Sequence, residues 1–227
     1  MSDRNEYLME DPEEAYRLEI KTDPADIRKH AAWFGIGPGA RVLDVGCGSG
    51  KTASLLSEIV QPGGEVVGVD FSEERIRYAA DKYREIKGLS FHTLDITREI
   101  PNLGKFDFVW VRFLLEYFQK EAREIIRNLV KCLRDDGSLC LMDLDNNCLS
   151  HYPLPEEMEK ILKRLVLAMS GQYNFDPYVG RKLYTYLYEL EFRDIQIDLT
   201  AHHLIYGELR SQDQYNWIKK LEMISRK

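Results

Sequence analysis

The chain has 227 residues, a formal net charge of −7 and 44% hydrophobic residues, which suits one domain over residues 1–227 with a large core. Its basic residues do not gather: Arg75, Arg77, Lys82 and Arg84 alternate with acids along one helical segment, which argues against a nucleic-acid partner. The four cysteines form no C-x-x-C pair, the first residues are polar, and no apolar run reaches the length of a membrane span. We therefore expect a cytoplasmic protein with reduced thiols and no membrane partner. The sequence leaves the number of subunits open.

Residues 5–34 have a helical pattern. Asp23 and Pro24 form an N-cap and first-turn pair, which predicts the start of a second helix. Arg17 and Lys21 lie four positions apart and therefore share one face of the first helix. The sequence from Ile36 to Gly39 ends this helical segment and leads into the first strand.

An apolar strand from Arg41 to Val45 runs directly into three alternating glycines at positions 46, 48 and 50. Glycine permits a tight turn and removes the Cβ that would keep a ligand away from the backbone. A helical stripe follows at once, formed by Leu55, Leu56, Ile59 and Val60. The helix N-terminus offers unpaired N–H groups and the positive end of a dipole. This turn is therefore predicted to bind a charged or nucleotide-like ligand.

The spacing of the glycines separates the kinds of nucleotide site. The chain has G-x-G-x-G, whereas the dinucleotide fingerprint is G-x-G-x-x-G. The segment from Gly48 to Thr52 looks like the end of a P-loop, but Val45 occupies the position of the first P-loop glycine. Asp70 ends the next apolar run, twenty residues after Gly50. A carboxylate at that place can accept both hydroxyls of a ribose.

Strands and helices continue to alternate along the chain. Ser72 predicts a helix N-terminus, because acidic residues follow in the first turn. Apolar runs predict strands at 89–94, 106–111 and 138–143, with a striped helix before the last of them. This alternation predicts a parallel sheet covered by helices on both faces.

The pattern changes after Asp143. A stripe from Met158 to Met169 predicts a helix over 155–170 whose apolar face lies in the core. Residues 171–190 are rich in tyrosine. Two strands, at about 192–199 and 201–207, and a helix from about 211 complete the predicted elements.

In these features the chain resembles the class I S-adenosylmethionine-dependent methyltransferases. Their first motif is similar to the segment from Val42 to Gly50, and their acidic residue after the second strand corresponds to Asp70. Asp95, the strand beginning at Phe106 and the turn ending at Gly137 match three further landmarks in the same order. The resemblance covers residues 35–145 strongly. It implies a three-layer, Rossmann-like α/β fold with a seven-stranded, mostly parallel sheet in the order 3-2-1-4-5-7-6, strand 7 being antiparallel.

The resemblance also implies how the single domain is organised. The expected parts are a helical lead-in or lid (1–34), a cofactor-binding core (35–145), substrate-lid helices (146–190) and a C-terminal hairpin with a helix (191–227).

S-adenosyl-L-methionine is the cofactor that the resemblance implies, with S-adenosyl-L-homocysteine as its product. Asp70 would hold the ribose, and Arg112 at the end of strand four would contact the cofactor or the acceptor, or else form a surface ion pair. The helix bearing Arg17 and Lys21 would cover the cofactor carboxylate or face solvent. The expected cofactor-binding residues are Arg17, Asp44, Gly46, Cys47, Gly48, Asp70, Phe71, Asp95, Ile96 and Arg112.

Methyl transfer is an in-line displacement at a carbon that the cofactor has already activated, so the protein mainly aligns the reactants and excludes water. A general base helps only if the acceptor carries a proton at the working pH. Candidates for that base are Glu116, His151 and His202, and candidates for acceptor binding are Tyr117, Tyr152, Tyr178 and Arg181; each residue has a purely structural alternative.

A metal site is not expected. The segment from Asp143 to Asn147 has several oxygen ligands, but as an EF-hand loop it has Cys148 in place of the required glycine. A magnesium-dependent methyltransferase would need an aspartate after strand four, where this chain has Arg112.

The sequence therefore predicts an S-adenosylmethionine-dependent methyltransferase that acts on a small molecule. One alternative is a non-catalytic protein that keeps the fold as a cofactor-binding scaffold or sensor. The other is a nucleotide-dependent oxidoreductase, which would bind a nicotinamide cofactor instead.

Overall fold

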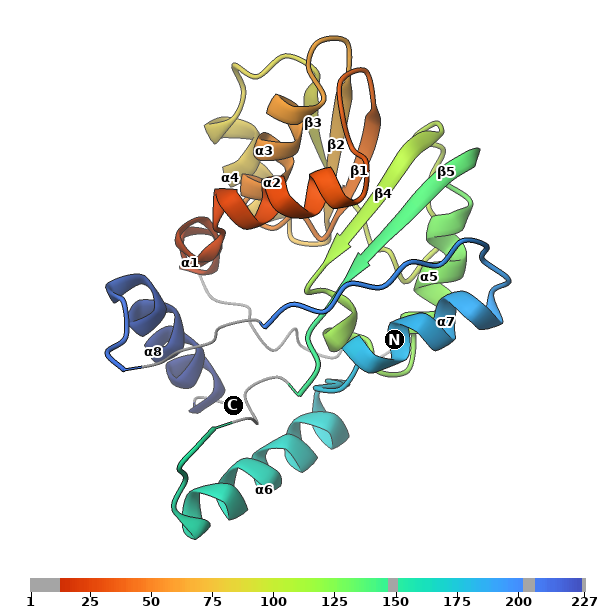
Figure 1. The fold of residues 1–227 in the computed structure, drawn as a ribbon. Coiled ribbons are helices and arrows are strands. Elements are labelled where there is room, and N and C mark those ends of the chain that lie inside the picture. The colour runs from red at the N-terminus through yellow and green to blue at the C-terminus, as the bar shows by residue number, and fades with distance from the viewer. Residues whose placement is uncertain (1–12, 147–150, 202–206, 226–227) are drawn as a thin grey trace.

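The centre of the protein is a parallel five-stranded sheet in the order β3-β2-β1-β4-β5 (Figure 1). This strand order confirms the predicted order for the first five strands. The computed structural model describes residues 13–146, 151–201 and 207–225. The strands are β1 (Arg41–Val45), β2 (Glu65–Asp70), β3 (Leu89–Thr93), β4 (Phe106–Arg112) and β5 (Leu133–Met142).

Helices cover both faces of the sheet, which confirms the three-layer α/β fold. Along the chain they are α1 (Glu14–Lys21), α2 (Pro24–Trp33), α3 (Lys51–Ile59), α4 (Glu73–Lys82), η1 (Leu115–Tyr117), α5 (Ala122–Val130), α6 (Glu156–Gln172), η2 (Gly180–Lys182), α7 (Leu183–Glu189) and α8 (Ser211–Ser225). In Figure 1, α2 and α3 lie on one side of the sheet and α5 lies on the other.

Alternate strand residues supply two cores, because successive side chains of a strand point to opposite faces. Val42 of β1 packs with buried residues of α2 and α3, including Ile27 and Leu56. Its neighbour Leu43 packs on the opposite face with Ile125 of α5. Both faces of the central strands are buried, so the carboxyl ends of these strands are left as the edge where a site can form.

The C-terminal part differs from the sequence prediction in two ways. In the described part of the chain, residues 192–199 have no regular secondary structure and join no sheet, and Asp194 in a bend has φ of 54°. Residues 202–206 of the second predicted strand lie outside the described part. Ile197 and Leu199 are 63% and 91% exposed. The alternating pattern is thus not sufficient for a strand, which also needs a partner for its backbone hydrogen bonds.

The predicted core stripe of α6 is buried only toward its C-terminal end. Met169 is buried with Leu165 packed beside it, whereas Met158 and Ile161 are exposed. Amphipathic spacing determines which face of a helix is apolar, but another element must pack against that face to bury it.

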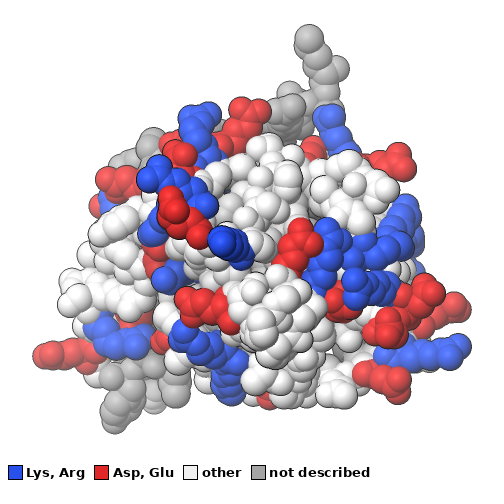
Figure 2. All heavy atoms as spheres, turned by 90° about the horizontal axis from the view of Figure 1, so that it is seen from above, with Lys and Arg blue, Asp and Glu red and all other residues white. Residues whose placement is uncertain are grey.

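Basic and acidic side chains are interspersed over the face seen in Figure 2, as the sequence pattern indicated. Among the described helices, none is long and apolar enough to cross a membrane.

We predict that Gly50→Ala destabilises the protein more than Gly35→Ala. Both glycines have a left-handed backbone, with φ of 81° and 77°, so either substitution costs roughly 1–2 kcal/mol. A Cβ at Gly50 would lie 2.8 Å from the Cβ of Ala79 and from Cζ of Phe91, whereas a Cβ at Gly35 would meet nothing within 4 Å. The clash adds roughly 1–3 kcal/mol, and urea denaturation of the two variants measures the difference. Equal losses would contradict the packing of α4 and β3 against this glycine.

Candidate functional site

The glycine loop leaves β1 at the carboxyl edge of the sheet and lies beneath the lead-in helix. The N–H groups of Gly46 and Cys47 donate to the carbonyl of Val69, at 2.8 and 3.0 Å, and so attach the loop to β2. A Cβ at Gly48 would lie only 2.7 Å from Cδ1 of Leu18, a residue of α1. The glycine is therefore needed for α1 to approach the loop closely.

The Asp70 carboxylate joins this loop to the start of α4. Its Oδ2 accepts the N–H of Gly48 at 3.0 Å, and its Oδ1 accepts the N–H of Ser72 at 3.0 Å. Arg75 donates two further hydrogen bonds to Oδ1, at 3.2 and 2.9 Å. Both side chains of this ion pair are buried. The Asp70 carboxylate is thus a structural link as well as a candidate ligand group, and Oδ2 keeps acceptor capacity.

Phe71 directly follows Asp70 and Ile96 follows β3, and the two residues lie in different environments. The Phe71 ring is 47% exposed, and the guanidinium of Arg75 lies 5.0 Å from its centroid. Ile96 is buried in the core that contains α5. Asp95 is exposed, and its Oδ1 accepts hydrogen bonds from the N–H and hydroxyl of Thr97. The Phe71 ring is therefore accessible to a flat ligand group.

Asp44 is buried at the end of β1, and its Oδ2 has no hydrogen-bond partner. Burial raises the pKa of this carboxyl to about 7, although the positive charge of Arg112 and an N–H of Ala53 act in the opposite direction. A cation brought next to Asp44 would favour the ionised form. Asp44 is thus suited to contact a positively charged group of a ligand.

Arg112 ends β4, and its Nε is buried without a hydrogen-bond partner. Its guanidinium lies 4.2 Å from the centroid of the Phe113 ring. Burial lowers the pKa of Arg112 to about 10, so that the group stays charged at neutral pH. The surface ion pair considered as an alternative for Arg112 is therefore not what the structure shows.

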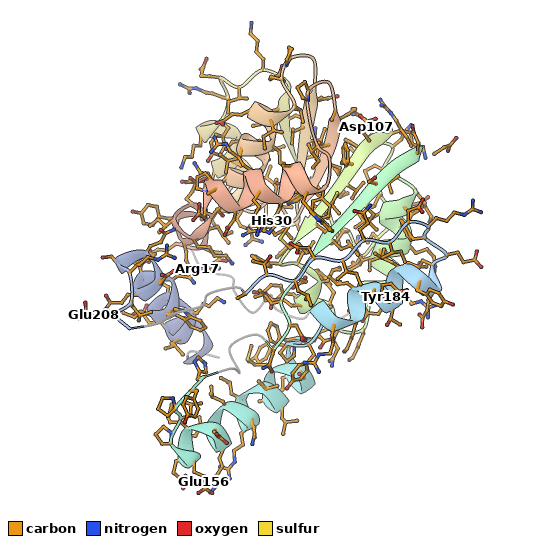
Figure 3. The ribbon with its side chains drawn as sticks, in the orientation of Figure 1. Arg17, His30, Asp107, Glu156, Tyr184 and Glu208 are labelled. Carbon is orange, nitrogen blue, oxygen red and sulfur yellow. The ribbon has the colours of Figure 1, made fainter. Side chains whose placement is uncertain are left out.

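Arg17 and Lys21 are not on a solvated helix face. Arg17 is 3% exposed, forms a two-pronged ion pair with Glu14 and donates to Asn216 of α8 (Figure 3). The ammonium of Lys21 lies 5.3 Å from the centroid of the Phe113 ring. Burial, and then the charges of Arg17 and Lys220, lower the pKa of Lys21 well below its usual value. The lead-in helix thus turns its basic face inward.

Glu116 and Tyr117 follow in η1, beside this basic group. Glu116 is buried, and its negative charge partly offsets the lowering of the Lys21 pKa. Tyr117 packs against Phe175 with ring centroids 5.7 Å apart. The backbone N–H of Asp176 donates to the carbonyl of Glu116 at 2.7 Å, which joins the tyrosine-rich segment to η1. The tyrosine-rich segment therefore lies against η1 at Glu116 and Tyr117.

Several predicted acceptor residues lie apart from this group. Tyr152 is 98% exposed, and His151 contacts Trp217 of α8 with ring centroids 6.4 Å apart. Arg181 is exposed, covers the Tyr178 ring at 5.0 Å and forms an ion pair with Asp145. His202 lies outside the described residues. The structure therefore brings Glu116 and Tyr117 to the sheet edge but does not bring Tyr152 there.

Four residues of the site were not predicted from the sequence. Arg75 belongs to a segment whose charges alternate, which hid its ion pair with Asp70. Lys220 is separated from Lys21 by nearly the whole chain, and no local pattern marks it. The others are Phe113 and His30, the second of which is labelled in Figure 3. Burial, and then the charge of Arg112, lower the pKa of His30.

The oxygen-rich segment after β5 was considered as a metal site, and its described residues have another role. Asp143 accepts N–H groups of Leu114, Leu115 and Glu116 on one oxygen and that of Leu144 on the other, so its carboxylate holds the loop after β4. Burial, and then the charge of Glu116, raise the pKa of Asp143 well above its usual value. Among the described residues, no three His, Cys, Asp or Glu side chains could hold a metal together.

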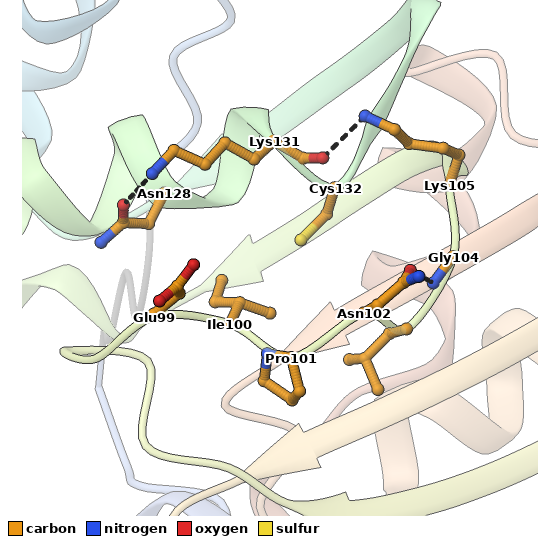
Figure 4. A pocket seen from close by; sticks show the side chains of 10 residues that line it. Glu99, Ile100, Pro101, Asn102, Gly104, Lys105, Asn128, Lys131 and Cys132 are labelled. Atoms are coloured by element: carbon orange, nitrogen blue, oxygen red, sulfur yellow. Dashed lines mark hydrogen bonds between the residues drawn. The ribbon is translucent and has the colours of Figure 1, made fainter.

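A groove of about 490 Å³ lies at the opposite edge of the sheet, near the starts of β4 and β5 (Figure 4). The ammonium groups of Lys105 and Lys131 are already bonded to the Lys131 carbonyl and to Asn128. Parallel α/β sheets bind ligands at the carboxyl ends of their strands, so we place the site at the glycine loop and not in this groove.

A model of the methyltransferase domain family matches residues 36–191. The chain belongs to this family. The match confirms the resemblance to class I methyltransferases that the glycine motif, Asp70 and the later landmarks carry.

Juvenile hormone acid O-methyltransferase from Bombyx mori is 33% identical over 109 residues, which are 47% of this chain and 38% of that protein. Demethylmenaquinone methyltransferase from Listeria welshimeri is 28% identical over 110 residues, 46% of this chain and 45% of that protein. The chain therefore spans less than half the length of these relatives. The crystal structure of a SAM-dependent methyltransferase from Aquifex aeolicus shares the fold, with a TM-score of 0.52 and 24% identity over 71% of this chain and 87% of that one.

We predict that Asp44 makes the ligand-free protein less stable as the pH rises from about 4 to about 7. The folded protein keeps the Asp44 proton until a pH of about 7, whereas the unfolded chain releases it near its ordinary pKa. The unfolded state thus binds fewer protons in this window, and the free energy of unfolding falls by roughly 2–4 kcal/mol. Urea denaturation at pH 4.5 and 7.5 should show that Asp44→Asn loses this part of the dependence. Asp81→Asn, on an exposed position of α4, is the control, and an Asp44→Asn profile parallel to it would contradict the assignment.

We also predict strong coupling between Asp70 and Arg75. Arg75→Met leaves the buried Asp70 carboxylate without its counter-ion and should lower the free energy of unfolding by roughly 3–5 kcal/mol. In the double variant Asp70→Asn/Arg75→Met, neither group is left charged, so the loss should be roughly 1–3 kcal/mol smaller than the sum of the single losses. The exposed Arg77→Met is the control on the same helix. Additive losses in the cycle would show that the two charges do not depend on each other.

Proposed function

We propose that this protein is a methyltransferase that transfers the methyl group of S-adenosyl-L-methionine directly to a small molecule. The observation that carries the proposal is the buried Asp70 carboxylate bonded to the backbone of Gly48 in the loop after β1. A carboxylate and bare backbone at one strand edge suit a ribose and its attached chain. The two curated relatives are named for a juvenile hormone acid and for demethylmenaquinone, which are small molecules.

The proposed place of the cofactor follows from the groups at this edge. Asp70 would accept the ribose hydroxyls through Oδ2, and the exposed Phe71 ring would cover the adenine from the Asp70 side. Asp95 and Ile96 would bound its far side. Asp44 and the loop from Gly46 to Gly48 would border the methionine part, whose ammonium is the positive group that a buried carboxyl such as Asp44 can receive. Arg17 would face its carboxylate, and Arg112 would contact the cofactor or the acceptor.

The reaction needs no protein nucleophile. The acceptor attacks the methyl carbon in line with the sulfonium, and the protein contributes alignment and a dry site. We propose that the lead-in helix, which touches the glycine loop through Leu18, and the segment 146–190, which is bonded to η1 through Asp176, cover the reactants. We also propose that the protein is cytoplasmic and that its partner is a small molecule and not a nucleic acid.

We predict that S-adenosyl-L-homocysteine binds with micromolar affinity, about −8 kcal/mol, in isothermal titration calorimetry. Asp70→Asn should weaken binding by roughly 1–3 kcal/mol, because the ribose hydroxyls lose a charged acceptor. Asparagine is preferred to alanine here because it fills the same space beside Arg75. Asp81→Asn is the matched control, since it removes an exposed carboxylate of the adjoining helix and should bind as the unaltered protein does.

Three other results would each contradict a part of the proposal. Equal affinity in Asp70→Asn would remove the ribose role of that carboxylate. Binding of a nicotinamide dinucleotide in place of S-adenosyl-L-homocysteine would favour the oxidoreductase alternative. Cofactor binding with no transfer of labelled methyl to any member of a metabolite library would favour a scaffold or sensor.

A further inference from the structure

We propose that the methyl acceptor is a carboxylic acid whose carboxylate is received by Lys21 and Arg112 next to the Phe113 ring. This inference rests on the proposed function, because it names the acceptor class of the same site. Three observations carry it: the excess of buried positive charge, the strained backbone of Phe113 and the charge that the cofactor would add.

The first observation is that three cations face one region without a counter-ion. The charges of Arg112 of β4 and Lys220 of α8 lower the pKa of Lys21 of α1, and in the described part of the chain none of the three lies within ion-pair distance of a carboxylate. An anion bound beside Lys21 would favour its charged form. Lys220 is 8% exposed, and Nε of Arg112 is buried without a partner. Buried charge that lacks a counter-ion is costly, so an anionic ligand would be stabilised here.

The nearby carboxyl groups do not cancel this charge. Glu14 is committed to Arg17. Asp143 is bonded to four backbone N–H groups, and burial raises its pKa. The proposed cofactor ammonium would pair with Asp44, so that Asp44 offsets none of the three cations. Asp26 of α2 also acts on Arg112 and raises its pKa, but Asp26 is exposed and its charge is screened by solvent. Glu116 is the one acidic side chain that offsets the charge of Lys21 among the described residues. Positive charge therefore predominates in this part of the site.

The second observation is the backbone of Phe113. This residue follows β4 directly and has φ of 54°, a left-handed conformation that costs a residue with a large side chain about 1–3 kcal/mol. The conformation is held by the hydrogen bond from the Phe113 N–H to the carbonyl of Met142, at 2.9 Å. It places the ring near both Lys21 and Arg112, at 5.3 and 4.2 Å from its centroid. Backbone strain of this kind is typical of functional sites, and here it fixes the direction of the Phe113 side chain beside the two cations.

The third observation concerns the cofactor. S-adenosyl-L-methionine has a sulfonium, an ammonium and a single carboxylate, so it brings a net positive charge to a site that is already positive. Even if its carboxylate faces one of the cations and its ammonium faces Asp44, a further anion is needed to balance the remaining positive charge. An ionised acceptor supplies this charge, and a planar carboxylate matches the donors of an arginine.

A carboxylate acceptor also fits the chemistry. One carboxylate oxygen attacks the methyl carbon, an O–CH₃ bond forms, and the S–CH₃ bond breaks with its electron pair returning to sulfur. The products are a methyl ester and S-adenosyl-L-homocysteine, and the charges of carboxylate and sulfonium cancel. No proton is transferred, so this step requires no general base.

The test measures thermal unfolding of the protein saturated with S-adenosyl-L-homocysteine at constant ionic strength. The probes are three matched pairs, acetate with acetamide, octanoate with octanamide and benzoate with benzamide, together with phenyl phosphate. We expect the acid of at least one pair to stabilise the complex at concentrations about tenfold lower than its amide. Lys21→Met should abolish this preference while keeping the affinity for S-adenosyl-L-homocysteine within about twofold. The exposed Lys29→Met should keep both properties.

Each other outcome decides a different point. Equal effects of acids and amides on a protein that binds S-adenosyl-L-homocysteine would overturn the anionic acceptor and leave the proposed function standing. Failure to bind S-adenosyl-L-homocysteine would overturn the proposed function itself. If the protein prefers phenyl phosphate and Lys21→Met removes that preference, the acceptor group is a phosphate and not a carboxylate. If Lys21→Met leaves the preference for acids unchanged, Lys21 does not receive the acceptor and the proposed site is wrong. Urea denaturation should find Lys21→Met at least as stable as the unaltered protein, because the variant removes a charge without a counter-ion.

Discussion

The Asp70 carboxylate is the interaction on which the site depends. Parallel strands leave their carboxyl ends at one edge of the sheet, but this does not fix the loops that leave them. Asp70 bonds to Gly48 of the loop after β1, to Ser72 at the start of α4 and to Arg75 one turn later. Because the pair with Arg75 is buried, removing one partner costs more than the pair is worth. The same carboxylate is thus both a fixed link and the proposed ribose acceptor.

This link also explains why the lead-in helix can contribute to the site. With the glycine loop fixed against β2, Leu18 packs on Gly48, and the turn of α1 beyond it places Lys21 beside Phe113. Helix α8 packs on the other side of α1, where Asn216 bonds to Arg17, and it adds Lys220. Elements from both ends of the chain therefore bring positive charge over the strand ends. Glu116 offsets part of this charge, whereas Asp143 is bonded to backbone donors and Asp26 is exposed to solvent, so the charges do not fully cancel.

The part of the site that is local in sequence could be predicted closely. Gly46, Gly48 and Asp70 lie at strand ends that follow from apolar runs, and the parallel arrangement places strand ends together. The order of the first five strands agrees with the prediction. Tyr152 and the stripe of α6 were predicted less well, because exposure is decided by what packs against a segment and not by its own pattern.

The sequence by itself determined the sheet, the glycine turn, the position of Asp70 and, through them, the methyltransferase family. These features depend on short-range patterns, since a strand, a turn and a helix each form from neighbouring residues. Only the tertiary structure decided that Arg75 is the partner of Asp70, that Arg17 and Lys21 face inward, and that Phe113 lies between two cations. The physical reason is that burial and charge pairing join residues far apart in the chain, and the energy of a charged group depends on all its neighbours at once.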